Sequence, residues 1–268
     1  MSFEISGPAG SRAAPLHTAR RGHGPTVALV HGFTQTSASW ARIAGELEHD
    51  FEVVTVDLPG HGRSPAPAPG SGIEQAAQAL GDACGKAAYV GYSLGGRCAL
   101  HLALGAPQLV ERLVVVGAHP GISDGPSRRL RREADERLAA ELERGGDAFV
   151  GDFIETWLKG PLFAHLTGEQ ADRGSRLANS AAGLAASLRT AGTGSQLPLW
   201  ERLGRLEMPV LVVVGARDDK FRPIAEQTAE AVGANARLAI VAGAGHAVGF
   251  ERPDEFAALV RDFLVGNA

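Results

Sequence analysis

The sequence predicts an α/β fold, in which helices cover both faces of a mostly parallel, twisted sheet and a helical cap is inserted in the chain. Three observations predict it. Short apolar runs such as Thr26–Val30 and Pro209–Val214 are typical of strands covered on both faces. These runs alternate with amphipathic segments, as in parallel strands joined by crossover helices. From Ser123 to about Leu203 the strand rhythm stops and only helical patterns remain.

The first half of the chain contains most of the predicted strands. Two weakly patterned strands, Phe3–Ser6 and Leu16–Arg20, are expected to pair antiparallel at a sheet edge. The following elements are, in order, the strand Thr26–Val30, a helix over Trp40–Leu47 capped by Ser39, the strand Phe51–Val56, the helix Ile73–Ala83, the strand Ala87–Val90, the helix Leu94–Leu104 and the strand Leu113–Val116.

The sequence of the second half of the chain predicts a helical cap, followed by the last part of the core. We expect a core of residues 1–122 and 201–268, with a cap over residues 123–200. The predicted cap helices are Arg128–Arg144, Asp147–Leu158, Gly168–Ala178 and Ala181–Ala191. The core resumes with the strands Pro209–Val214 and Leu238–Val241 and the helices Ile224–Val232 and Pro253–Leu264.

The composition narrows the class of protein. At 268 residues and 44% hydrophobic, the chain can bury the core of one large domain with an insertion. A net charge of −4 gives no general attraction for nucleic acid or for an anionic membrane. No apolar run reaches the roughly 18 residues that span a bilayer, and no export signal is visible. With no such signal, Cys84 and Cys98 are expected as reduced thiols in a cytoplasmic protein.

A serine motif stands between a predicted strand and a predicted helix. Gly91-Tyr92-Ser93-Leu94-Gly95 has the form Gly-x-Ser-x-Gly, which can also arise by chance in a chain with 35 glycines. The strand before it and the helix after it favour a nucleophile elbow, a sharp turn that exposes the Ser93 hydroxyl at the end of the sheet. Small residues two before and two after the serine let the strand and the helix approach closely.

An acid and a histidine follow two later strands. Asp218 and Asp219 come after the strand Pro209–Val214, and His246 comes after the last strand. The order serine, acid, histidine is that of the α/β-hydrolase arrangement, in which the histidine deprotonates the serine and the acid orients the imidazole. From spacing alone, either aspartate can hold the acid role.

Other polar residues compete for a catalytic role. His31 follows the strand Thr26–Val30, and Asp57 and His61 lie together in a turn rich in proline and glycine. Those positions favour structural roles for all three side chains.

The loop after the strand Thr26–Val30 is also expected to form part of an oxyanion hole. In sheets of the hydrolase type this loop supplies one backbone N–H, so we expect the N–H groups of Phe33 and Leu94 to stabilise negative charge.

Arginines are concentrated near the start of the predicted cap. Arg128, Arg129, Arg131 and Arg132 begin a helix, where cations oppose the macrodipole. Solvated i,i+4 pairs with Glu133, Asp135 and Glu136 account for most of them. Arg131 borders the apolar stripe Leu130, Ala134, Leu138 and Leu142, which we expect to be buried, so it can face a cleft. Arg97, one turn beyond Ser93, either faces the site or forms a surface salt bridge.

The chain resembles a known enzyme family over nearly its whole length. The fold-level motifs are His31-Gly32-Phe33, Asp57-Leu58-Pro59-Gly60-His61-Gly62 and Gly215-x-x-Asp218. The more discriminating ones are Gly91 to Arg97, His119-Pro120-Gly121, the arginines before Asp135, Trp157 followed by Pro161-Leu162-Phe163, Arg176-Leu177-Ala178-Asn179 and Asp218-Asp219-Lys220-Phe221. On these motifs the chain is similar to the 2-succinyl-6-hydroxy-2,4-cyclohexadiene-1-carboxylate synthases of menaquinone biosynthesis, within the α/β-hydrolase superfamily.

This resemblance implies the site residues and the reaction. It implies that Ser93, Asp218 and His246 form the triad, and that Asp218 rather than Asp219 is its acid. It also implies substrate contacts from Tyr92, Arg97, Arg131 and Trp157, with Arg128 and Arg132 as alternatives to Arg131. The implied enzyme is a lyase that removes a ring proton from a succinyl-enolpyruvyl-cyclohexene carboxylate and eliminates pyruvate. The implied partner is a small polycarboxylate, and no metal or organic cofactor is implied.

Two other functions remain compatible with the sequence. The same triad suits a serine hydrolase that cleaves an ester or a C–C bond, and Ala247-Val248-Gly249-Phe250 after the histidine resembles general hydrolases. A non-enzymatic receptor for small molecules on this fold is the other. Turnover assays separate the three functions.

Overall fold

Seven strands form one sheet in the computed structural model, which describes residues 15–266. The strand order is β1-β3-β2-β4-β5-β6-β7. Only β1 (Thr18–Arg21) runs antiparallel, against β3 (Glu52–Val56), at one edge. The other strands are parallel: β2 (Thr26–Val30), β4 (Ala87–Tyr92), β5 (Val110–Val116), β6 (Val210–Gly215) and β7 (Ala236–Val241). The predicted edge pairing of Phe3–Ser6 lies outside the described residues.

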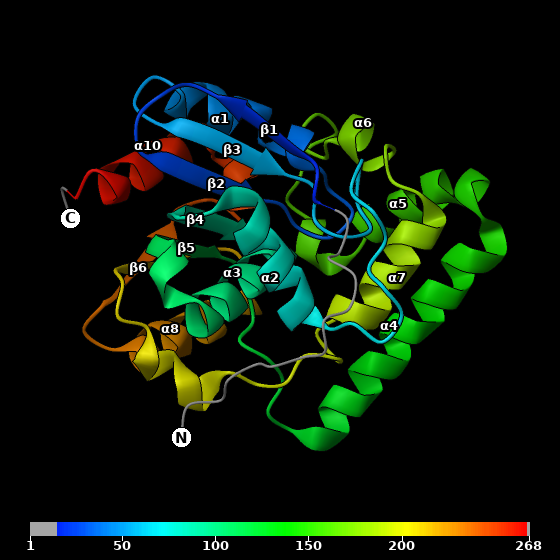
Figure 1. Ribbon diagram of the computed structural model, residues 1–268. Helices are drawn as coiled ribbons and strands as arrows, with labels where there is room; N and C mark the ends of the chain where they lie inside the picture. Colours follow the sequence, from blue (N-terminus) through cyan, green and yellow to red (C-terminus); the bar gives the residue numbers. More distant parts are fainter. Residues whose placement is uncertain (1–14, 267–268) are drawn as a thin grey trace.

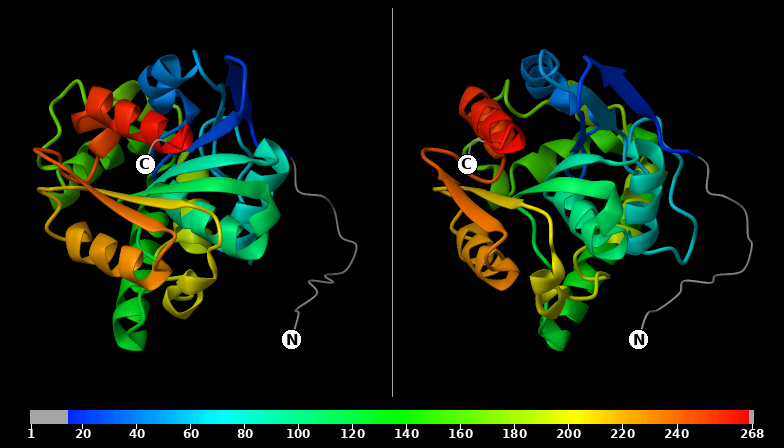
Figure 2. Two further views of the ribbon diagram at one scale, coloured as in Figure 1. Left: turned by 90° about the vertical axis from the view of Figure 1, so that its left-hand side faces the viewer. Right: turned by 60° about the vertical axis from the view of Figure 1, so that its left-hand side comes forward.

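Helices cover both faces of the sheet. One layer consists of α1 (Ala41–Leu47) and α10 (Pro253–Leu264), and the other of α2 (Ile73–Cys84), α3 (Leu94–Gly105) and α8 (Phe221–Val232). Figure 1 shows these elements, and Figure 2 shows the two layers on opposite sides of the sheet.

The alternation of side chains along a strand explains the two layers. In β2, Val27 and Leu29 join the apolar cluster under α1 and α10, whereas Ala28 and Val30 join the cluster under α2, α3 and α8. Because both faces of β2, β4 and β6 are buried, these central strands are apolar at nearly every position. The predicted α/β fold is confirmed.

A helical segment lies between β5 and β6. It contains α4 (Gly125–Gly145), α5 (Val150–Leu158), α6 (Arg173–Arg176) and α7 (Ala181–Ala191), with 3-10 turns at Asp147–Phe149 and Pro161–Phe163. Helices α4 and α7 pack side by side (Figure 1). Asp124 caps α4 by accepting the Ser127 N–H at 2.7 Å, and Ser180 caps α7 by accepting the Gly183 N–H at 3.1 Å.

Some local predictions were wrong. The predicted helix Gly168–Ala178 is reduced to α6, because Asp172 takes a left-handed conformation (φ 50°) that interrupts it. Ser39 does not cap α1, since it lies in the 3-10 turn Ser37–Trp40 and its hydroxyl donates to Asp172. Leu130 is 65% exposed rather than part of a buried stripe. The helix α9 (Val248–Glu251) and the 3-10 turns Pro107–Leu109 and Trp200–Arg205 were not predicted.

Candidate active site

Ser93 sits in a strained turn between β4 and α3. Its φ is 51° and its ψ is −107°, and its N–H donates to the Val116 carbonyl at 2.8 Å. A Cβ on Gly91 would lie 2.5 Å from the Gly95 carbonyl oxygen, and one on Gly95 would collide with the Val30 carbonyl. The two glycines are therefore required by close backbone contact, which is the geometry of a nucleophile elbow.

Asp218 and His246 form a buried pair at the same end of the sheet. His246 Nδ1 donates to Asp218 Oδ2 at 2.6 Å, and the two residues are only 3% and 5% exposed. The other oxygen, Asp218 Oδ1, accepts the Phe221 N–H at 3.1 Å. Asp219 is exposed, so the geometry selects Asp218 as the partner of the histidine. This arrangement leaves Nε2 of His246 free to accept a proton.

A second carboxylate holds the loop that carries His246. Glu251 is buried, and its two oxygens accept the N–H groups of Gly245 at 2.7 Å and of Ala247 at 3.0 Å. These are the residues on either side of His246, so Glu251 fixes the backbone from which the imidazole projects. Sequence reasoning did not single it out, although it lies five residues after the histidine.

The two expected oxyanion donors lie beside Ser93. Phe33 and Leu94 line the same cavity as the serine. Neither the Phe33 N–H nor the Leu94 N–H donates a hydrogen bond to another group within residues 15–266. Leu94 is the first residue of α3, where backbone N–H groups have no acceptor within the helix. Both donors are therefore available to a ligand.

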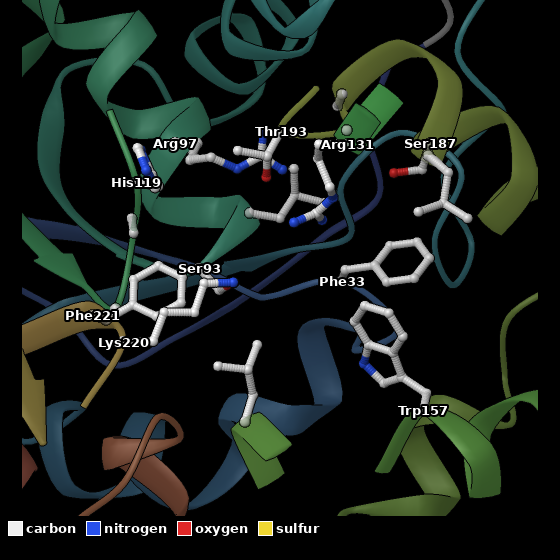
Figure 3. A pocket seen from close by; sticks show the side chains of 17 residues that line it. Phe33, Ser93, Arg97, His119, Arg131, Trp157, Ser187, Thr193, Lys220 and Phe221 are labelled. Atoms are coloured by element: carbon white, nitrogen blue, oxygen red, sulfur yellow. The ribbon is translucent and has the colours of Figure 1, made fainter. Parts of the chain in front are cut away.

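A cavity that is open to solvent lies above Ser93, between the core and the helical segment. Figure 3 shows its lining. The core contributes Phe33, Ser93, Arg97, His119 and Lys220, and the helical segment contributes Arg131, Trp157 and Ser187. Three cationic side chains thus share one cavity with the serine.

Arg97 is a buried cation with no carboxylate partner. It is 7% exposed, and its Nη1 donates to Gln196 Oε1 at 3.0 Å. Within residues 15–266 no carboxylate oxygen lies within 4.0 Å of its guanidinium. Burial lowers the pKa of Arg97 to about 10, and the charge of Arg131 acts in the same direction. A group that costs so much to bury calls for an anion in the cavity.

Among the arginines that begin α4, Arg131 faces this cavity. Its Nε donates to Asp135 Oδ1 at 2.8 Å, as the i,i+4 pattern predicts. Arg128 instead donates to the Ile122 carbonyl at 2.8 Å, and Arg132 does not line the cavity. The expected pairs Arg129–Glu133 and Arg132–Glu136 are absent from the described residues. Glu136 instead pairs with Arg189 of α7 at 2.8 Å.

A smaller cavity joins Ser93 to His246 and contains a further arginine. Its other lining residues are Phe33, Tyr92, Trp157, Leu162, Phe163 and Arg176. Arg176 is 1% exposed, its Nε donates to the Ala171 carbonyl at 2.8 Å, and its guanidinium lies 5.7 Å above the Phe163 ring. Burial lowers its pKa.

Sequence reasoning included Arg176 in a family motif but gave it no role. Its placement on the four-residue helix α6 left no periodic signal to indicate which way the side chain points.

The remaining expected contacts also reach the two cavities. Trp157 lines both, and its buried Nε1 has no hydrogen-bond partner in the described part of the chain. The Tyr92 ring centre lies 5.4 Å from that of His246. Lys220 lines the larger cavity, and burial lowers its pKa. Burial, with the charge of Lys220, lowers the pKa of His119 to about 4, so this histidine is neutral at pH 7.

The competing candidates lie away from both cavities. His31 is buried, with Nδ1 2.8 Å from the Gly32 carbonyl and Nε2 accepting the Leu58 N–H at 3.0 Å. Asp57 accepts the N–H groups of Ser37 at 2.6 Å and Arg63 at 2.9 Å. His61 Nδ1 lies 3.1 Å from the Pro59 carbonyl. These side chains organise loops, as the turn composition indicates.

No group of three or more His, Cys, Asp or Glu side chains among residues 15–266 is arranged to hold a metal ion. No helix in that part of the chain has the length and apolar character needed to cross a membrane.

Comparison with known proteins places the chain among enzymes of this fold. Residues 27–259 match the model of the Alpha/beta hydrolase family. The putative 2-succinyl-6-hydroxy-2,4-cyclohexadiene-1-carboxylate synthase of Bacillus subtilis (strain 168) is 34% identical over 250 residues, which cover 89% of each chain. The synthase of that name from Enterobacter sp. (strain 638) is 32% identical over 90% of this chain and 92% of its own. The structure of MenH from S. aureus has a TM-score of 0.83 at 28% identity, over 92% of this chain and 97% of that chain.

Proposed function

Because the chain belongs to the alpha/beta hydrolase family and, within it, to the 2-succinyl-6-hydroxy-2,4-cyclohexadiene-1-carboxylate synthases, we propose that it is a lyase of menaquinone biosynthesis. Its substrate is a succinyl-enolpyruvyl-hydroxycyclohexene carboxylate, and its products are the cyclohexadiene carboxylate and pyruvate.

Ser93 acts as a base in this proposal. His246 Nε2 accepts the Ser93 hydroxyl proton, and Asp218, 2.6 Å from Nδ1, stabilises the imidazolium. The serine oxygen then removes a ring proton, and the electron pair collects on an enolate-like oxygen held by the N–H groups of Phe33 and Leu94. The pair returns to the ring as a double bond while the C–O bond to the enolpyruvyl group breaks. His246 returns the proton to the leaving group, and no metal or organic cofactor is needed.

The burial of Arg97 beside Ser93 is the observation that supports the proposal most directly. Arg97 is a buried guanidinium in the same cavity as Ser93, with an amide oxygen rather than a carboxylate as its partner. A substrate with several carboxylates completes its pairing by charge-assisted hydrogen bonds. Arg131 and Arg176 add two further cations around the serine. Arg131 has Asp135 as a counter-ion, whereas Arg97 and Arg176 pair with no carboxylate within residues 15–266, and a neutral ester would leave both in that state.

The helical segment acts as a cap in this proposal. Residues 123–200 supply Arg131, Trp157 and Arg176, whereas the core, residues 1–122 and 201–268, supplies the triad, Arg97 and Tyr92. Substrate then binds between the two parts, which exclude water from the developing charge. We also propose a cytoplasmic location, because Cys84 and Cys98 are free thiols buried in the core.

Incubation of the protein with the enolpyruvyl substrate, with pyruvate release followed by a coupled assay, tests this function. We expect turnover that the Ser93→Ala variant lacks, and little hydrolysis of small neutral esters. A serine hydrolase is the alternative, because a strained nucleophile elbow also suits acyl transfer. Ester turnover with acyl-enzyme accumulation and no pyruvate release would contradict the lyase and support the hydrolase.

A further inference from the structure

The loop after β2 contains a turn in an unfavourable conformation. The Gln35 N–H donates to the Gly32 carbonyl at 3.1 Å and so closes the turn Gly32-Phe33-Thr34-Gln35. Thr34, its third residue, has φ 69°. That position usually takes glycine or asparagine, and a β-branched residue persists there only when its surroundings hold it. The Phe33 N–H, the proposed oxyanion donor, belongs to this turn, so its direction depends on the shape of the turn.

Asn179 contacts this turn from a distant part of the chain. It is 6% exposed, and its Nδ2 donates to the Thr34 carbonyl at 2.7 Å and to the Arg176 carbonyl at 2.9 Å. Its Oδ1 accepts the Gly62 N–H at 2.9 Å. Both amide hydrogens and the amide oxygen are thus used, and Asn179 joins three backbone segments through one planar group.

Neighbouring residues attach the same part of the helical segment to the same loop. The Arg176 guanidinium donates to the Thr34 hydroxyl. The Ser175 hydroxyl lies 2.6 Å from the Thr36 hydroxyl, and the Ser39 hydroxyl donates to Asp172. Residues 172–179 therefore hold the turn and the residues after it from outside, in addition to the local hydrogen bond from the Gly32 N–H to Gln35 Oε1 at 2.9 Å.

We propose that Asn179 is a positioning residue for the oxyanion hole. By holding the Thr34 carbonyl it maintains the left-handed turn that directs the Phe33 N–H at the ligand. This inference rests on the proposed function, because it takes Phe33 as an oxyanion donor. The oxyanion hole then depends on the contact of residues 172–179 with the core. When that part of the helical segment leaves the core, the turn loses its hydrogen bonds to Arg176 and Asn179, and the Phe33 N–H no longer points at the ligand.

The variants Asn179→Ala and Asn179→Asp test the proposal. The aspartate variant has nearly the same volume and keeps an acceptor for the Gly62 N–H, but it cannot donate to the Thr34 carbonyl. The matched control is Asn235→Ala, because Asn235 Nδ2 also donates to a backbone carbonyl, that of Leu206 at 2.9 Å, and lines neither cavity.

We expect kcat for pyruvate release to fall about 10- to 100-fold in both Asn179 variants, because removal of an oxyanion donor typically costs 10²- to 10³-fold and here the donor is misdirected rather than removed. KM should stay within about 3-fold, since Asn179 lines neither cavity and the hole acts on the transition state. A kcat near that of the wild type, or a loss confined to KM, would overturn the proposal. Recovery of kcat in Asn179→Asp alone would also overturn it, since only the Gly62 bond would then matter.

Hydrogen exchange separates failure of this inference from failure of the proposed function. If the wild-type protein releases no pyruvate, the lyase function is wrong, but the exchange rate of the Gln35 amide still reports the turn. In Asn179→Ala this amide should exchange at least about 10-fold faster than in Asn235→Ala. Equal rates in the two variants would overturn the inference whatever the activity.

Discussion

The two sides of the active site are built differently. The core side places Ser93, Asp218 and His246 at the ends of strands such as β4 and β6, which are buried at every position. The helical segment supplies Arg131, Trp157 and Arg176 from helices that are packed much less deeply. Of the 21 residues in α4, only Asp135, Ala139 and Leu142 are buried. The groups that move protons, together with Arg97, thus lie on the rigid part, and the other two arginines lie on the helical segment.

Hydrogen bonds join the two sides in addition to apolar contacts such as that of the Phe33 ring with the Trp157 ring, whose centres lie 5.2 Å apart. The apolar cluster inside the helical segment is small and includes three alanines, Ala139, Ala181 and Ala185. The segment is attached to the core loops by hydrogen bonds, such as those of Arg176 and Asn179 to Thr34. Hydrogen bonds exchange with water at little net cost, whereas a large apolar interface resists opening. This construction suits a part of the molecule that separates from the core and returns.

The largest expected effect lies on the core side. Ser93→Ala and His246→Ala should each lower kcat at least about 10³-fold, because each removes the proton-transfer path, and Asp218→Asn should act through the imidazole tautomer. The double variant Ser93→Ala/His246→Ala should be little worse than either single variant, since the residues act as a unit. Steady-state pyruvate release measures this, and near-normal activity of Ser93→Ala would remove the proposed base.

The same asymmetry decided what the sequence could predict. Ser93, Asp218 and His246 each follow a strongly apolar strand, and strand ends of a parallel sheet meet at one edge, so their proximity was predictable. Arg176 and Asn179 lie where a left-handed Asp172 breaks the helical pattern, so their directions were not. Leu130 was expected to be buried because the spacing of apolar residues predicts which side of the helix packs against other elements. The spacing does not predict how many turns of the helix those elements cover. Glu251 was missed because it accepts hydrogen bonds from backbone N–H groups. Every residue except proline has such a group, so no residue pattern indicates the contact.

The next largest effect lies with the arginines of the larger cavity. Arg97→Ala and Arg131→Ala should lower kcat/KM by about 10- to 150-fold, because charge-assisted hydrogen bonds contribute about 1.5–3 kcal/mol and 1.36 kcal/mol is tenfold. Arg97 should show the larger loss, since Arg131 already spends part of its binding capacity on Asp135. Lysine at either position should recover only part of the activity, because an ammonium lacks the planar fork.

Arg129→Ala is the matched control for these variants, as Arg129 is exposed on the same helix and lines neither cavity. It should change kcat/KM less than about 2-fold. A second readout is thermal stability: Arg97→Met should melt at the same temperature as the wild type or higher, because it removes a buried cation without a carboxylate partner. Equal, small losses of activity at positions 97, 129 and 131 would contradict a polycarboxylate substrate.

Acid should destabilise the core side. Burial lowers the pKa of His31 to about 4 and that of His61 to about 3, whereas both are near 6.5 in an unfolded chain. As the pH falls below about 6.5, the unfolded chain binds protons that the folded chain does not, so the free energy of unfolding decreases down to the folded pKa values. We expect a loss of roughly 2 kcal/mol per histidine between pH 7 and pH 5.

Urea unfolding at the two pH values measures this loss. His61→Gln should flatten the dependence on pH, while His49→Gln, at an exposed position, should leave it unchanged. His165 is the only histidine within residues 123–200, and it is exposed, so the acid sensitivity should originate in the core rather than in the helical segment. An identical pH dependence in the His61 and His49 variants would contradict this assignment.

The smallest expected effect is a difference in local opening between the helical segment and the core. Amide hydrogen exchange measures it directly. Amides of α4 and α7 should exchange at least about 10-fold faster than those of β2 and β6, because α4 buries only three of its residues and the buried side chains of α7 pack mainly within the helical segment. A polycarboxylate ligand that bridges Arg97 on the core and Arg131 on α4 binds only the closed arrangement. It should therefore slow exchange in α4 and α7 by mass action and leave β2 and β6 nearly unchanged. Uniform protection of helices and strands without ligand would show that the helical segment and the core open as one unit, and the arginines would then be fixed in place before substrate arrives.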